Sequence, residues 1–116
     1  FALASMIMPP INGVDENSEI AERFYLAQNY PNPFNPTTTI SYSIPNSAVI
    51  ATNNVANVNM IVYDALGRKV ETLVNKQQAT GNYSVKFNAS NLPSGIYFYR
   101  LTVNNLTVTK KMMLLK

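Results

Sequence analysis

The sequence predicts an all-β domain, an immunoglobulin-like β-sandwich of about seven antiparallel strands. Short runs of alternating apolar and polar residues recur from residue 24 onward. Turn residues interrupt these runs about every 8 to 12 residues, which is the spacing typical of a sandwich. A length of 116 residues, 47% of them hydrophobic, suits one compact core without metal or disulfide support. We expect no helix of consequence.

The first strands follow from the alternation. We expect a short strand around Tyr25–Gln28 and a half-buried strand over Thr37–Ile44, whose apolar residues Ile40, Tyr42 and Ile44 share one face. The run Val58–Asp64 is apolar on both faces, which indicates a more central strand. The connection over residues 46–57 is long for a hairpin. It is either a loop that crosses between sheets or a loop with an extra short strand at residues 49–52.

The remaining strands are marked by their turns. Gly67 in the three-residue loop Ala65–Gly67 can supply a positive φ, so the strands on either side, 58–64 and 68–75, should form a hairpin. Residues 91–95 are a turn, and Asn104-Asn105 suit a type I′ turn between strands 96–103 and 106–115. A separate strand over 81–88 should direct three side chains inward: Tyr83, Val85 and Phe87.

Composition excludes most enzyme mechanisms, because the chain has no histidine and no cysteine. We therefore expect no enzyme activity, no cofactor and no metal site. Residues 1–63 hold one basic and four acidic residues, whereas residues 64–116 hold eight basic and two acidic residues. The basic residues are spread along expected strands, so we interpret them as a solvated sheet face rather than a nucleic-acid site.

The chain divides into two parts. Residues 1–23 comprise an apolar start and a polar linker, and residues 24–116 form the expected sandwich. The apolar start is too short to span a membrane, so no transmembrane segment is expected. It is the remnant of a preceding domain, a segment that packs on its own sheet, or a donor strand for the open sheet edge of a second copy. The candidate donor residues are Phe1, Leu3, Met6, Ile7 and Met8.

A proline-rich segment precedes the first long strand. The prolines should prevent both helix and sheet pairing, which predicts a rigid, extended segment with one aromatic anchor. This proline segment consists of Pro31, Asn32, Pro33, Phe34, Asn35 and Pro36.

Four stretches carry a resemblance to a known family. They are Q-N-Y-P-N-P-F-N-P-T-T-T-I-S-Y-S-I-P, I-V-Y-D-A-L-G-R-K-V, L-P-S-G-I-Y-F-Y-R-L and the terminal K-K-M-M-L-L-K. Their sequence and order resemble the type A C-terminal sorting domain of the type IX (Por) secretion system, over residues 24–116. The connection 46–57 is longer than is usual in that family.

The resemblance implies a function without catalysis. Such domains end the exported proteins of Bacteroidetes and related bacteria, where the outer-membrane export apparatus reads them. In many cargoes a sortase-like peptidase then removes the domain and joins the cargo to surface lipopolysaccharide. The protein would accordingly be secreted or displayed on the cell surface. The recognition-bearing residues implied are Asp64, Gly67, Arg68, Gly95, Tyr97, Arg100, Lys110, Lys111 and Lys116.

Each of these residues also has a structural interpretation. Asp64 can cap its own turn, Gly67 and Gly95 suit turn geometry, and the terminal residues can complete a strand. Two other functions stay open. One is a self-assembling filament subunit that polymerises through the donor strand, and the other is sugar binding through Tyr97 and Tyr99.

Overall fold

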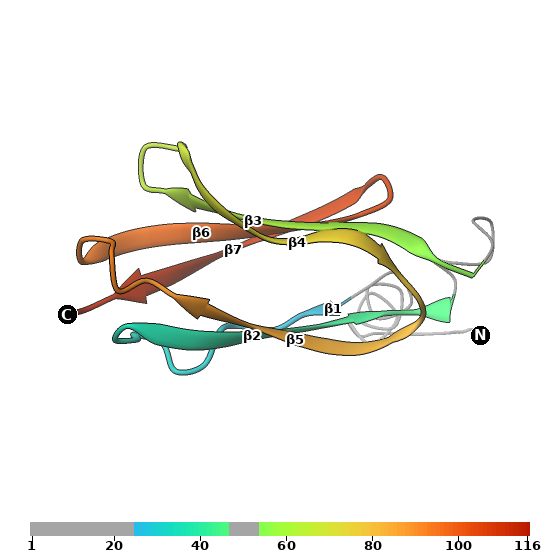
Figure 1. The fold of residues 1–116 in the computed structure, drawn as a ribbon, viewed down its shortest axis with the longest axis horizontal. Coiled ribbons are helices and arrows are strands. Elements are labelled where there is room, and N and C mark those ends of the chain that lie inside the picture. The colour runs from blue at the N-terminus through green and yellow to red at the C-terminus, as the bar shows by residue number, and fades with distance from the viewer. Residues whose placement is uncertain (1–24, 47–53) are drawn as a thin grey trace, which may run out of the picture.

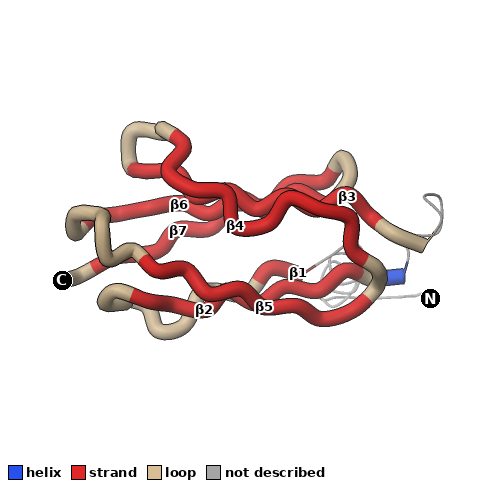
Figure 2. The backbone as a smooth tube through the Cα atoms, in the orientation of Figure 1, coloured by secondary structure: helices blue, strands red, loops and turns tan. Residues whose placement is uncertain are grey.

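The computed structural model describes residues 25–46 and 54–116, and it confirms the predicted all-β sandwich. Two antiparallel sheets stack face to face (Figure 1), and the described chain consists almost entirely of strands and loops (Figure 2). The strands are β1 (Tyr25–Leu26), β2 (Thr37–Ile44), β3 (Ala56–Asp64), β4 (Lys69–Gln78), β5 (Gly81–Asn88), β6 (Gly95–Val103) and β7 (Leu106–Leu114).

The strand order explains which segments are central. One sheet has the order β1-β2-β5, and the other has the order β4-β3-β6-β7. β3 lies between β4 and β6, as its apolar residues on both faces predicted. The predicted hairpins β3–β4 and β6–β7 are both present.

The core lies between the two sheets, and along the strands every second side chain points into it. In β2, the predicted inward residues are almost completely buried, and in β5 Phe87 is buried while Tyr83 and Val85 are half-buried against the core. β3 and β6 contribute the largest share of the core: Ala56, Val58, Met60, Val62, Tyr97, Tyr99, Leu101 and Val103. The alternation in the sequence therefore predicted the correct inward face for β2 and β5.

β4 extends beyond the predicted residues 68–75. It continues to Gln78, which pairs with Ala56, and the carboxamide oxygen of Gln78 accepts a hydrogen bond from the buried Tyr42 hydroxyl at 2.6 Å. This polar strand end has no alternating pattern, so the sequence did not reveal it. Two register shifts against β3 lie between Met60 and Ile61 and between Val62 and Tyr63.

The tight turns confirm one expectation and correct another. Gly67 has the predicted positive φ, at 86°. In the β6–β7 turn only Asn104 has a positive φ, at 55°. A type I′ turn needs positive φ at both central residues, whereas type II′ needs it only at the first. The φ angles therefore match type II′ and not the predicted type I′.

The proline segment is neither fully extended nor free of sheet pairing. The chain bends back so that Tyr30 pairs with Thr39, and Phe34 forms a parallel bridge with Leu114 of β7. The prediction was wrong because only the prolines lack N–H groups, and the residues between them keep theirs. The N–H of Phe34 donates to the carbonyl of Met113 at 2.9 Å, and its carbonyl accepts from the N–H of Leu115 at 3.0 Å.

Several predictions fall on residues that the structure does not describe. These are the domain boundary at residues 23 and 24, the donor residues within 1–8, and the proposed extra strand at 49–52. All three stay predictions.

Candidate functional site

The family-like stretches, which lie far apart in the sequence, meet at one end of the sandwich. Figure 1 shows the β3–β4 turn, the loop before β6, the proline segment and the C-terminus together at the left. We call this region the motif end and define it as residues 31–36, 64–68, 89–95 and 112–116. β1 starts toward the opposite end, because Tyr25 pairs with Ser43 near the last residue of β2. The chain therefore enters the sandwich far from the motif end.

The β3–β4 turn is held by Asp64. One carboxylate oxygen accepts the backbone N–H groups of Leu66 at 3.0 Å and Arg68 at 2.9 Å, and the other accepts the Arg68 Nε–H at 2.8 Å. The Arg68 backbone N–H contributes most to lowering the pKa of Asp64 below its usual range. The N–H of Gly67 donates to the Asp64 carbonyl at 2.9 Å. Asp64 thus has the structural role of a turn cap, and its carboxylate is ionised at neutral pH.

A groove separates this turn from the loop that precedes β6. Its volume is about 370 Å³, and its walls are mainly apolar. Leu66 stands at the rim with 78% of its surface exposed, an unusual position for a large apolar side chain. The lining includes Asp64, Arg68, Val70, Leu92, Gly95, Ile96 and Tyr97.

Tyr97 forms the floor on the core side. It is buried, and its hydroxyl donates to the Pro93 carbonyl at 2.7 Å. Burial raises the pKa of this hydroxyl. Tyr99, two residues on, is fully buried as well. The suggestion that Tyr97 and Tyr99 bind sugar is therefore wrong, because both side chains point into the core between the two sheets.

Tyr99 positions the segment that leads into the proline segment. Its hydroxyl donates to the Ala27 carbonyl at 2.7 Å and accepts the Asn29 N–H at 2.9 Å. Burial raises the pKa of Tyr99 to about 12. The side chain of Asn29 in turn donates to the Thr38 hydroxyl at 3.0 Å. This buried network joins β6 of one sheet to the start of the other.

Phe34 is the predicted aromatic anchor. It is 2% exposed, and its ring lies 6.0 Å from the ring of Phe87, centroid to centroid. The carboxamide oxygen of Asn32 accepts the Met113 N–H at 3.0 Å. The proline segment is therefore pinned to both the core and the edge of β7.

The C-terminal residues are fixed to the loop before β6. The backbone N–H of Lys116 donates to the Ser94 hydroxyl at 2.9 Å, and its ammonium group donates to the Ser90 carbonyl at 2.6 Å. Leu115 remains 51% exposed. The motif end thus presents an ordered surface with exposed apolar side chains.

The structure brings together some of the implied recognition residues and separates others. Five lie at the motif end, namely Asp64, Gly67, Arg68, Gly95 and Lys116, and Tyr97 lines the groove beside them. Arg100 and Lys111 lie on the outer face of the four-stranded sheet, and Lys110 is half-buried on β7. Sequence reasoning missed Leu66, Leu92, Ser90 and Ser94. A leucine inside a glycine-containing turn is the one signal that could have identified Leu66.

Comparison with protein families identifies the group to which the chain belongs. Residues 28–115 match the sequence model of the secretion system C-terminal sorting domain. The chain belongs to this family. No curated protein and no solved structure gives a significant match.

The role of this protein follows from its membership in the sorting-domain family. It is a C-terminal sorting signal of type IX secretion, and it interacts with that machinery on its way across the outer membrane to the cell surface or the medium. The family's role is sorting rather than catalysis. Within residues 25–46 and 54–116, no cluster of three metal-binding side chains occurs and no helix is long and apolar enough to cross a membrane.

Proposed function

We propose that the motif end is the part of this sorting domain that the outer-membrane export apparatus recognises and binds. The observation that carries the proposal is the convergence of the proline segment, the Asp64–Arg68 turn and the chain terminus at one end of the sandwich. That end lies away from Tyr25, where the described sandwich begins, so a cargo domain joined ahead of Tyr25 would enter at the opposite end. A receptor can therefore bind it without contacting the cargo.

The contact surface combines apolar and basic groups. Leu66 and Leu115 are exposed there, at 78% and 51%, and Arg68 lies in the same turn as Leu66 and lines the same groove. Exposed apolar side chains beside a groove are typical of an interaction surface. Because the hydrogen bonds of Asp64 already fix the turn, binding need not order it, and little conformational entropy is lost.

A reporter-export experiment tests this assignment. A neutral reporter is fused ahead of the full chain and expressed in a bacterium that has type IX secretion. Leu66→Asp is compared with Leu106→Asp, a matched control at the start of β7, near the opposite end of the sandwich. We expect the parent and Leu106→Asp fusions to reach the surface or the medium and Leu66→Asp to accumulate in the periplasm.

Thermal unfolding of both variants establishes that each remains folded. Export of Leu66→Asp at the parent level contradicts the proposal, as does equal retention of both variants.

Removal of the domain and attachment of the cargo are the second part of the proposal. A sortase-like peptidase cuts between cargo and sandwich and joins the cargo to surface lipopolysaccharide, as the family resemblance implies. The mass of the exported reporter distinguishes the outcomes. A reporter that has lost the sandwich and gained a heterogeneous glycolipid supports this step, and an intact fusion contradicts it.

A further inference from the structure

The outer face of the four-stranded sheet, which points away from the core, is divided into two chemically different halves. Near the motif end, one row of side chains crosses all four strands: Lys69, Tyr63, Phe98 and Lys111. Neighbouring strands lie about 4.8 Å apart, so the row is roughly 14 Å long. Two cations thus flank two aromatic rings. We call this the aromatic half.

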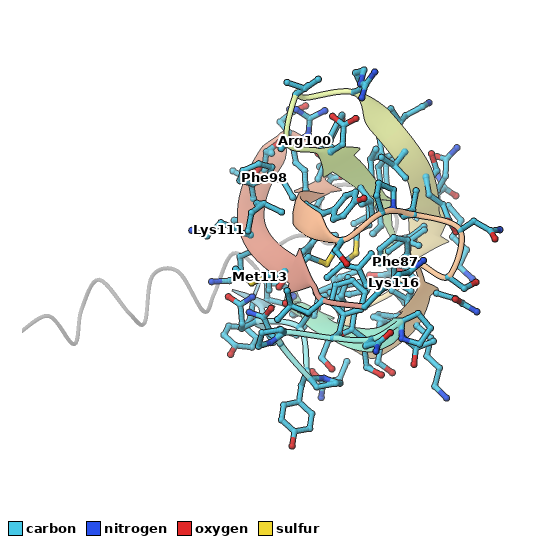
Figure 3. All side chains as sticks on the ribbon, turned by 90° about the vertical axis from the view of Figure 1, so that its left-hand side faces the viewer. Phe87, Phe98, Arg100, Lys111, Met113 and Lys116 are labelled. Atoms are coloured by element: carbon cyan, nitrogen blue, oxygen red, sulfur yellow. The ribbon has the colours of Figure 1, made fainter. Side chains whose placement is uncertain are left out.

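Arg100, in the neighbouring row, adds a third cation to the aromatic half. Its guanidinium lies 4.7 Å from the centre of the Tyr63 ring and donates to the Tyr63 hydroxyl. A hollow of about 240 Å³ opens over Tyr63, Phe98, Arg100 and Thr109. Figure 3 shows Phe98, Arg100 and Lys111 along one side of the sandwich, on the other side of the sheet from the core residue Phe87. These side chains contribute to a surface, not to the core.

The other half of the same face carries amides and hydroxyls. Its rows continue away from the motif end with Asn59, Asn75, Thr102, Thr107, Asn57 and Gln77. Several of these groups are held by their neighbours, as where the Gln77 amide donates to the Asn57 side chain at 3.2 Å. A second hollow, of about 270 Å³, lies over this amide half.

The face carries a net positive charge. Among the described residues, none in the rows that cross all four strands on this face is acidic. Asp64, at the adjoining turn, is already paired with Arg68, and the exposed Glu71 on the edge strand β4 is outnumbered by Lys69, Arg100 and Lys111. The face therefore attracts anions.

We propose that this face binds an anionic polysaccharide, a role beyond the sorting function. The electron-rich faces of Tyr63 and Phe98 suit the C–H faces of sugar rings. Lys69, Lys111 and Arg100 can bind carboxylate or phosphate substituents. The amide half offers the donors and acceptors that hydroxyl groups need. An acidic peptide would use the cations but would leave the rows of amides and hydroxyls without a matching partner, so a hydroxyl-rich ligand fits the whole face better.

Titration calorimetry with the full chain tests this inference. The probe is an oligogalacturonate, which carries one carboxylate on each ring, and its methyl ester keeps the rings but removes the charges. We expect the oligogalacturonate to bind, more weakly as salt increases, and the ester to bind much more weakly. Polyglutamate, which has the charges without the rings, should bind less well than the oligogalacturonate.

Matched variants locate the binding site. Lys111→Glu and Phe98→Ser should each lower the affinity for oligogalacturonate about fivefold or more. Lys86→Glu and Tyr30→Ser, which alter exposed residues away from this face, should leave it within about twofold. Failure of the oligogalacturonate to bind overturns the inference. So does polyglutamate binding of equal strength, or equal losses from the control variants.

Discussion

Removal of a single oxygen atom, in Tyr99→Phe, tests how the two sheets are joined. Tyr99 is 0% exposed, and its hydroxyl both donates to the Ala27 carbonyl and accepts the Asn29 N–H. The substitution leaves the ring in place, so no large cavity forms. It leaves the buried N–H of Asn29 without a partner, at about 1 to 3 kcal/mol, and removes a hydrogen bond from the half-buried Ala27 carbonyl, at about 1 kcal/mol. We expect the free energy of unfolding to fall by about 2 to 4 kcal/mol.

Urea unfolding followed by circular dichroism measures this loss. Tyr30→Phe is the matched control, because it removes a hydroxyl from a tyrosine that is 81% exposed. The control should change the free energy of unfolding by less than about 0.5 kcal/mol. A Tyr99→Phe loss no larger than that of the control refutes the assigned role of the Tyr99 hydroxyl.

Alkaline pH provides a second test of the same hydroxyl. The pKa of Tyr99 is raised from 10.0 to about 12 in the fold, so its protonated state stabilises the protein below pH 10 and this contribution is lost as the pH rises toward 12. A difference of about two pKa units corresponds to about 2.7 kcal/mol. The stability gap between parent and Tyr99→Phe should therefore narrow by that amount between pH 10 and 12. Tyr42 and Tyr97 ionise equally in both proteins, so a constant gap contradicts the burial of Tyr99.

Two further predictions concern the motif end. Phe34→Ala removes a ring that is 2% exposed and should cost about 3 to 5 kcal/mol of unfolding free energy, whereas Tyr30→Ala, at an 81% exposed site, should cost little. Equal costs in urea unfolding would exclude Phe34 as the anchor. Because the pKa of Asp64 is lowered from 3.8, its carboxylate stabilises the fold above that pH and ceases to do so as the pH falls through the lowered value. Melting temperatures of Asp64→Asn should therefore lie below those of the parent at pH 7 and converge with them in acid, and parallel curves would contradict this role.

The sequence predicted the strands well where side chains alternate. β2 and β5 begin and end at the predicted residues, because each has a clear apolar face bounded by turn residues. The end of β4 was missed because its last residues are polar. Gln78 is buried, its carboxamide oxygen accepts the Tyr42 hydroxyl, and no local pattern indicates that contact.

The candidate site was predictable in its parts but not in its assembly. The turn geometry of Gly67 and the capping role of Asp64 follow from local rules. The contact between Asn32 and Met113 joins residues far apart in the chain, and strand pairing across such separations leaves no local signal. An aromatic strand can direct either face toward the core, and the local sequence does not decide which. Tyr97 and Tyr99 are buried because they face the other sheet, whereas Arg100 of the same strand faces outward.

The bridge between Phe34 and β7 has a consequence for the timing of export. Phe34 lies early in the sandwich, whereas its partners Met113 and Leu115 belong to the last residues of the chain. A polypeptide that has not yet been synthesised through Leu115, or that has been trimmed there, lacks the second half of this contact. If the export apparatus recognises the motif end, it can bind only molecules that have been synthesised through Leu115 and have folded, because only these present the complete surface. Sorting through this surface then also selects for folded protein.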